Sequence, residues 1–124
     1  MSILTFSNGS KADIKVLPFE QAMNLKNIFL KSISDSNLSP NEPLVKLYAH
    51  IDSLPEFNKV VMNCLERCLY DGKKITIDTF EPIEARENYY EIVLELLKVN
   101  ITPFFKGLAS RLQALSEEMA KIQR

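Results

Sequence analysis

The stretch from Phe80 to Asn100 constrains the fold more than any other part of this sequence. Its second half is apolar on nearly every side, and a helix of that kind needs neighbours on most of its faces. Asp78 can cap its free amides and Glu81 stands in capping-box spacing, while Pro103 opens a new segment. We therefore predict a central helix that ends at Asn100. Its apolar side chains are Tyr89, Tyr90, Ile92, Val93, Leu94, Leu96, Leu97 and Val99.

A β-hairpin is predicted before the helices. Ile3–Phe6 and Ala12–Val16 have the composition of short strands. Asn8 and Gly9 lie between them, and this dipeptide is a strong hairpin signal because both residues tolerate positive φ. An isolated hairpin is only marginally stable, so it must pack on helices or gain a third strand.

Helical spacing of apolar residues recurs in four further segments. These segments are Phe19–Ser34, Leu44–Ser53, Phe57–Leu69 and Pro103–Gln123. Between the first two, Ser34–Pro43 is rich in loop-forming residues and is expected to be the most mobile part of the chain.

The segment Lys73–Asp78 follows Asp71 and Gly72, which are expected to end the third of these helices. It is extended by propensity, with Ile75 and Ile77 expected to face one way. It is either the third strand beside the hairpin or an extended linker that places two isoleucines on the core.

Together these elements predict a mainly α fold, a compact bundle of about five helices with a small N-terminal β-hairpin. The length of 124 residues favours a single domain over residues 1–124. Within it we expect a hairpin over residues 1–17, a helical core over 18–102 and a C-terminal amphipathic helix over 103–124.

Charge and composition exclude several classes of function. A formal net charge of -1 provides no field of one sign for nucleic acid or an anionic membrane. We expect no signal peptide, because polar residues interrupt the first 17 positions, and no apolar run reaches membrane-spanning length. The two cysteines, Cys64 and Cys68, fit a reducing cytosol.

Candidate chemical sites are few, and no catalytic, cofactor or metal site is predicted. Cys64 and Cys68 stand four residues apart within an apolar stripe, so core packing is favoured over metal binding. The only histidine, His50, has no orienting partner and is expected at the surface. A solvated helix face is favoured over a metal site for the acidic residues Glu84, Glu87, Glu91 and Glu95.

The last helix carries the most informative pattern. From Phe105 to Ile122 its apolar residues step by three and four, as in a coiled-coil seam. The helix either docks on its own core or offers the seam to a partner helix or another copy. We expect core burial for Phe104–Leu108 and partner binding for Leu112–Ile122. The predicted partner-binding residues are Phe104, Phe105, Leu108, Leu112, Leu115, Met119 and Ile122.

Five segments resemble the tail assembly chaperones of long-tailed, siphovirus-type bacteriophages. They are Phe6–Gly9, Val16–Phe19, Ile75–Glu81, Arg86–Tyr90 and Asn100–Leu108, and together they span most of the chain. The matching motifs are structural and not catalytic.

This resemblance implies a non-enzymatic protein without cofactors in the cytoplasm of the bacterial host. Its partners would be the tape-measure protein, which it holds, and the tail-tube protein, whose subunits it helps to recruit. It would be absent from the mature virion, and a longer frameshifted product often accompanies such proteins. A homo-oligomer is compatible with the seam. The alternatives are a small structural virion protein of the tail or connector, or a helical protein-interaction module.

Overall fold

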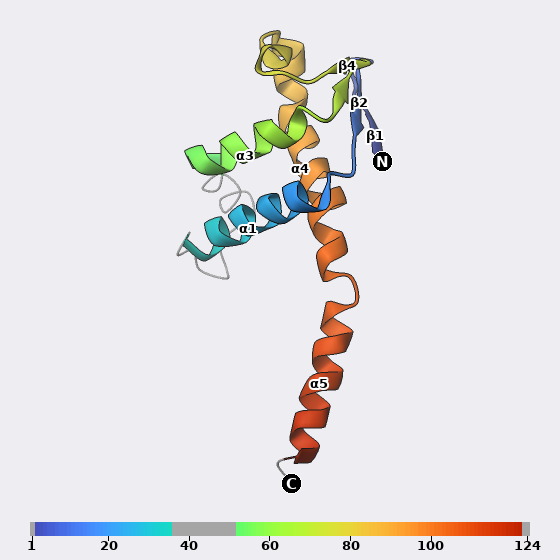
Figure 1. The fold of residues 1–124 in the computed structure, drawn as a ribbon. Coiled ribbons are helices and arrows are strands. Elements are labelled where there is room, and N and C mark those ends of the chain that lie inside the picture. The colour runs from blue at the N-terminus through green and yellow to red at the C-terminus, as the bar shows by residue number, and fades with distance from the viewer. Residues whose placement is uncertain (1, 36–51, 123–124) are drawn as a thin grey trace.

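The computed structural model describes residues 2–35 and 52–122, which combine helices with a four-stranded antiparallel sheet (Figure 1). The predicted compact bundle of about five helices is wrong, although most described residues are helical. The predicted loop Ser34–Pro43 and helix Leu44–Ser53 lie almost wholly outside the described residues, as does His50. The elements are β1 (Ser2–Thr5), β2 (Lys11–Ile14), α1 (Phe19–Asp35), α3 (Pro55–Leu65), β3 (Leu69–Tyr70), β4 (Lys73–Lys74), the 3-10 helix η1 (Ile77–Phe80), α4 (Ile83–Phe105) and α5 (Leu108–Ile122).

The predicted N-terminal hairpin is present, with Thr5 of β1 opposite Lys11 of β2. Its turn differs from the expected one, because Gly9 has a φ of 91° while Asn8 does not have positive φ. The amide of Gly9 donates to the carbonyl of Phe6 at 3.0 Å, and the Asn8 side chain accepts from the amide of Ser10. The loop is therefore a tight turn closed by a glycine, a common three-residue solution for hairpins.

The third strand of the sheet is β3, which pairs with β2 between Asp13 and Leu69. Asp71 and Gly72 do not end a helix as predicted; their positive φ values of 51° and 81° form the two-residue turn between β3 and β4. Such a turn requires positive φ at both positions, and this favours Asp-Gly. The preceding helix, α3, ends earlier than expected, at Leu65.

Both readings of Lys73–Asp78 need correction. Only Lys73 and Lys74 form a strand, and they pair with β3 at the edge of the sheet, not with the N-terminal hairpin. Ile75 is fully buried whereas Ile77 is 71% exposed, so the two isoleucines do not face the same way. The chain turns into η1 between them, and this breaks the two-residue alternation of a strand.

The helix α4 is central as predicted, but its ends are not where the capping signals placed them. It begins at Ile83 after Pro82, and Asp78 lies inside η1, whose N-cap is Thr76. It continues past Asn100 and through Pro103 to Phe105.

Asn100 does not end α4, and its side chain instead makes three hydrogen bonds within the fold. Its Oδ1 accepts a hydrogen bond from the amide of Leu17 at 2.8 Å, and its Nδ2 donates to the carbonyls of Leu96 and Lys15. The side chain is buried, where an unpaired amide would be costly. Asn100 therefore fixes the segment between β2 and α1 onto α4.

The hydrophobic core lies where α4 meets α1, α3 and the sheet. The expected burial of α4 is confirmed for Ile92, Val93, Leu96 and Leu97, but Tyr90 and Leu94 are each 51% exposed. The largest fully buried side chains of the whole core are Phe57, Ile14, Leu25, Leu65, Ile75, Ile92, Leu96, Val61, Val93, Cys64 and Cys68.

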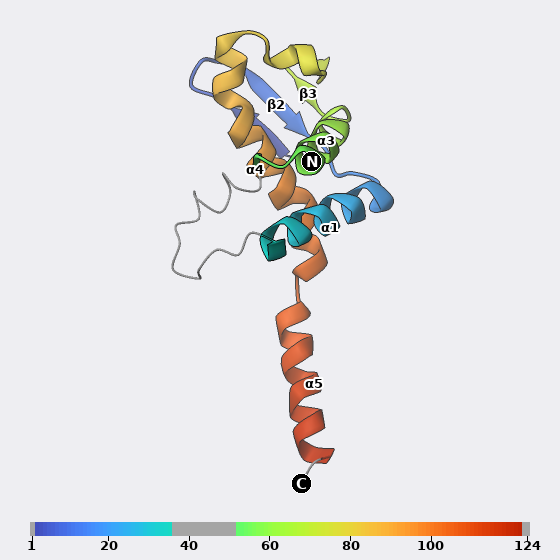
Figure 2. The same cartoon turned by 90° about the vertical axis from the view of Figure 1, so that its left-hand side faces the viewer.

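The helix α5 lies outside this packed body. Two roughly perpendicular views show it continuing beyond the end of α4 and away from α1, α3 and the sheet (Figures 1 and 2). The described residues therefore form a packed body with a projecting C-terminal helix, and not the compact bundle that the sequence predicted.

Candidate protein-binding surface on the C-terminal helix

The projecting helix carries an exposed apolar stripe. The stripe consists of five side chains that are spaced alternately four and three residues apart, so all five lie on one side of α5. The exposed fractions range from 39% for Leu108 to 81% for Ile122. Exposed apolar side chains that line up on one helix face are a candidate surface for another protein. This α5 stripe consists of Leu108, Leu112, Leu115, Met119 and Ile122.

The predicted seam is interrupted at its start. Phe104 and Phe105 belong to the last turn of α4, and α5 begins only at Leu108. Lys106 and Gly107 connect the helices, and Gly107 has a φ of 80°, which favours glycine. Of the seven predicted partner-binding residues, five therefore share α5 and two lie before the break.

Phe104 anchors the end of α4 to the body. Its ring lies 5.8 Å from that of Phe19 and is half-buried, and the Nζ of Lys26 lies 5.2 Å from its centroid. Phe105 is 40% exposed. The expected burial of the Phe104–Leu108 end therefore holds for Phe104 but not for Phe105 or Leu108.

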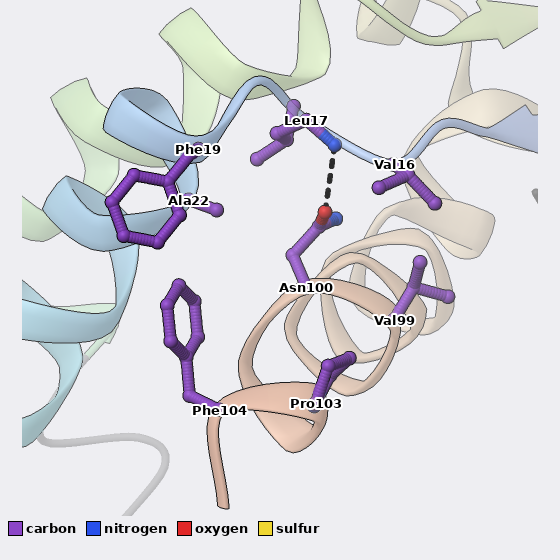
Figure 3. Close-up of a pocket in the computed structure, with 8 residues that line it drawn as sticks. All are labelled: Val16, Leu17, Phe19, Ala22, Val99, Asn100, Pro103 and Phe104. Carbon is purple, nitrogen blue, oxygen red and sulfur yellow. Dashed lines mark hydrogen bonds between the residues drawn. The ribbon is translucent and has the colours of Figure 1, made fainter.

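An open apolar pocket of about 340 Å³ lies at the root of the projecting helix. Figure 3 shows the ring of Phe104 facing Phe19, while Asn100 accepts the hydrogen bond from the Leu17 amide. Val16 and Phe19 are 66% and 72% exposed at its rim. Its lining residues are Val16, Leu17, Phe19, Ala22, Val99, Asn100, Pro103 and Phe104.

The sequence did not identify Val16 and Phe19 as surface residues. Phe19 has the spacing of a core residue in α1, and Val16 extends an apparent strand. The one available signal was Pro18, which cannot continue a strand ladder and suits the entry to a helix, so a connection is expected beside it.

The acidic side chains predicted as a solvated face lie along α4. Within residues 2–35 and 52–122, no three His, Cys, Asp or Glu side chains are grouped to hold a metal ion. Three acidic residues of α4 are exposed, as expected, and Glu95 accepts a hydrogen bond from the Ser2 hydroxyl at 2.7 Å. The exposed residues are Glu84, Glu87 and Glu91.

The adjacent tyrosines have different environments. The ring of Tyr89 is half-buried and meets Phe80 edge-on at 5.0 Å. Tyr90 is half-exposed and donates its hydroxyl to the Asp52 carboxylate at 2.9 Å. That hydrogen bond raises the pKa of Tyr90, because the carboxylate stabilises the protonated phenol.

The predicted burial of Cys64 and Cys68 is confirmed, since both are 0% exposed. Cys68 lies beyond the end of α3, so the two do not share a helix as predicted. Burial raises the pKa of Cys64 to about 11, with a further contribution from Cys68. The pKa of Cys68 is also raised, chiefly by burial.

We expect both thiols to react slowly with a thiol reagent in the folded protein, because the thiolate is the reactive form and neither sulfur is accessible. Unfolding in urea should make both react rapidly. Rapid labelling of both without denaturant would contradict their burial.

The same burial makes the stability of the folded protein depend on pH. The pKa of the Cys64 thiol is 9.0 when it is exposed to water and about 11 in the folded protein. The stabilisation from keeping this thiol buried and neutral should be complete below pH 9.0 and be lost as the pH rises to about 11. Urea unfolding at several pH values measures this loss.

A comparison of the sequence with models of known protein families identifies its family. The model described as "Phage tail assembly chaperone protein, TAC" matches residues 18–113, more than half of the chain. The chain belongs to this family of phage tail assembly chaperones. The expected resemblance is thereby confirmed. The match covers the packed body from α1 onward and the first part of α5.

Comparisons of this chaperone with curated proteins and with solved structures gave no match. Among its described helices, none combines the length and apolar character needed to cross a membrane.

Proposed function

We propose that this chaperone binds the phage tape-measure protein through the α5 stripe and holds it until tail-tube subunits assemble around it. The role is non-enzymatic and takes place in the cytoplasm of the bacterial host. The chaperone helps to recruit tube subunits and does not remain in the mature virion.

One observation carries this proposal: the α5 stripe is exposed along its whole length. Burying apolar side chains stabilises a complex by roughly 25 cal/mol per Å² of surface removed from water. A stripe at three- and four-residue spacing accepts another helix with the same spacing. A long helical client that exposes apolar seams before it is sheathed is the partner that such a surface fits.

The projection of α5 from the body supports the same proposal. A client helix can lie alongside α5 without displacing α1 or α3, because α5 continues beyond the end of α4 in both views (Figures 1 and 2). The body remains free to contact a second protein, and this suits recruitment of the tube subunit.

Co-expression of the full chain with the tape-measure protein of the same phage tests the proposal. We expect the two to copurify, and the tape measure to precipitate when it is expressed alone. A tape measure that stays soluble by itself and does not copurify would contradict the proposed role. Mass spectrometry of purified virions separates this role from that of a structural tail protein, which would be present at stoichiometric levels.

A further inference from the structure

The α5 stripe has nearly the same spacing when it is read from either end. Leu108, Leu112, Leu115 and Met119 are separated by four, three and four residues. A second α5 laid antiparallel can thus place its Met119 against Leu108 and its Leu115 against Leu112, with each contact repeated by symmetry. The stripe is self-complementary, and two copies would form four apolar layers.

The charges beside the stripe distinguish between orientations of the two helices. Arg111 and Glu118 are exposed, and each directly precedes an apolar layer, at Leu112 and Met119. In the antiparallel arrangement, Arg111 of one copy lies beside Glu118 of the second copy, and the pair occurs twice. In a parallel arrangement Arg111 would instead face the neutral Ser116. Charge complementarity therefore favours the antiparallel orientation.

The same charges fix the register. Sliding the helices by seven residues in one direction places Arg111 against Arg111, and in the other direction it places Glu118 against Glu118. Like charges in these positions are destabilising. Only the central register combines four apolar layers with two opposite-charge pairs.

The position of α5 on the molecule permits this pairing. At about 1.5 Å per residue its 15 residues span roughly 22 Å. An antiparallel partner would hold its own packed body near the far end of α5, away from the first body (Figure 2). A parallel partner would bring the two bodies side by side at the same end.

We propose that α5 pairs with α5 of a second copy as an antiparallel coiled coil in this register. The occupant of the stripe in the free protein is thus another molecule of the same chain. The inference does not rest on the proposed binding of the tape measure, although the two partners would use the same side chains and exclude each other.

A charge-swap experiment on the full chain tests the pairing by sedimentation equilibrium over a wide protein concentration range at low salt. Arg111→Glu and Glu118→Arg each replace two attractive contacts with two repulsive ones, so each should weaken dimerisation roughly tenfold or more. The double variant Arg111→Glu/Glu118→Arg restores both pairs and should recover the wild-type dissociation constant to within about threefold.

Loss of the helix cannot account for the expected weakening in the single variants. Arg111 lies in the first turns of α5 and Glu118 in its second half. Placing an acid near the start or a base near the end suits the helix dipole. Glu118→Arg also removes the 4.0 Å contact with Lys121, but that pair is exposed and contributes little, so both changes should leave α5 intact. Far-UV circular dichroism verifies this in each variant.

Disulfide trapping reports the orientation independently. Chains carrying Leu112→Cys mixed with chains carrying Leu115→Cys should form a heterodimeric crosslink, whereas Leu112→Cys alone should not crosslink to itself. A parallel pair would give the opposite result. Cys64 and Cys68 are buried and should not compete.

Three results would overturn the proposal: a wild-type chain that remains monomeric at all concentrations, single charge swaps that leave dimerisation unchanged, or self-crosslinking of Leu112→Cys. None involves the tape measure, so failure of the pairing and failure of the proposed function can be distinguished. A monomeric chain that still copurifies with the tape measure would refute the pairing alone. A dimer that matches the charge-swap pattern but does not bind the client would refute the proposed function alone.

Discussion

Leu112→Glu should abolish binding of the tape-measure protein while the packed body of the chaperone remains folded. Leu112 lies in the middle of the α5 stripe and is 54% exposed. In a complex, the new carboxylate would be buried against apolar side chains without a partner, so affinity should fall at least about 100-fold. In the free monomer the carboxylate stays in water, so the free energy of unfolding should change by less than about 0.5 kcal/mol.

Gln113→Glu is the matched control for this prediction. It introduces the same charge one residue later, on the opposite side of α5 from the stripe, at an exposed position. Binding measured by copurification should be retained in this variant and lost in Leu112→Glu. Urea unfolding of both should be followed at low protein concentration, because self-association would otherwise add to the apparent stability of the wild type. A folded Leu112→Glu chain that still binds its client would refute the role of the stripe.

Leu96→Ala should destabilise the chaperone by roughly 2–5 kcal/mol. Leu96 is 0% exposed on α4, where α1, α3 and the sheet meet. Removing its branched end loses the transfer free energy of the buried groups and leaves a cavity that the surrounding side chains cannot fully close. Because a domain of this size is stabilised by only about 5–15 kcal/mol, the change should be readily seen in urea unfolding.

The same helix supplies the control. Leu94 lies two residues earlier on α4 and is 51% exposed, so Leu94→Ala makes the same chemical change with less burial lost. We expect its effect to be well under half of that of Leu96→Ala. Equal losses at both positions would mean that Leu94 is covered in solution by another molecule or that α4 is not the centre of the fold.

Local sequence signals were sufficient for the features that depend on neighbours along the chain. The spacing of apolar residues located α1, α3 and α4, because helical periodicity follows from backbone geometry alone. The Asn-Gly dipeptide located the first hairpin, although only Gly9 has positive φ. The apolar neighbours of Cys64 and Cys68 indicated burial of both thiols.

Signals with two local interpretations were resolved only by distant contacts. Asp-Gly after an apolar helix reads equally well as a helix end or a hairpin turn. Here Asp71 accepts a hydrogen bond from the amide of Lys11 at 2.8 Å and donates its own amide to the Lys11 carbonyl at 2.7 Å. Pairing with Lys11, 60 positions earlier in the chain, therefore makes Asp71 part of a hairpin turn and not of a helix end. The same holds for Asn100, whose partners Leu17 and Lys15 belong to the segment before α1.

The α5 stripe also combines a local feature that the sequence predicted with an exposure that depends on distant packing. The sequence by itself predicted a helix over Pro103–Gln123 with one narrow apolar stripe, because spacing and helical geometry indicate it. The structure confirms the helix and the stripe over Leu108–Ile122. The sequence could not determine whether that stripe is buried, since the same pattern suits a helix docked on its own core and one that faces a partner. Only the tertiary structure decided this: Phe104 anchors the end of α4, Gly107 breaks the helix, and α5 projects from the body. The physical reason is that periodicity records which side chains share a face, whereas exposure depends on where the rest of the chain packs.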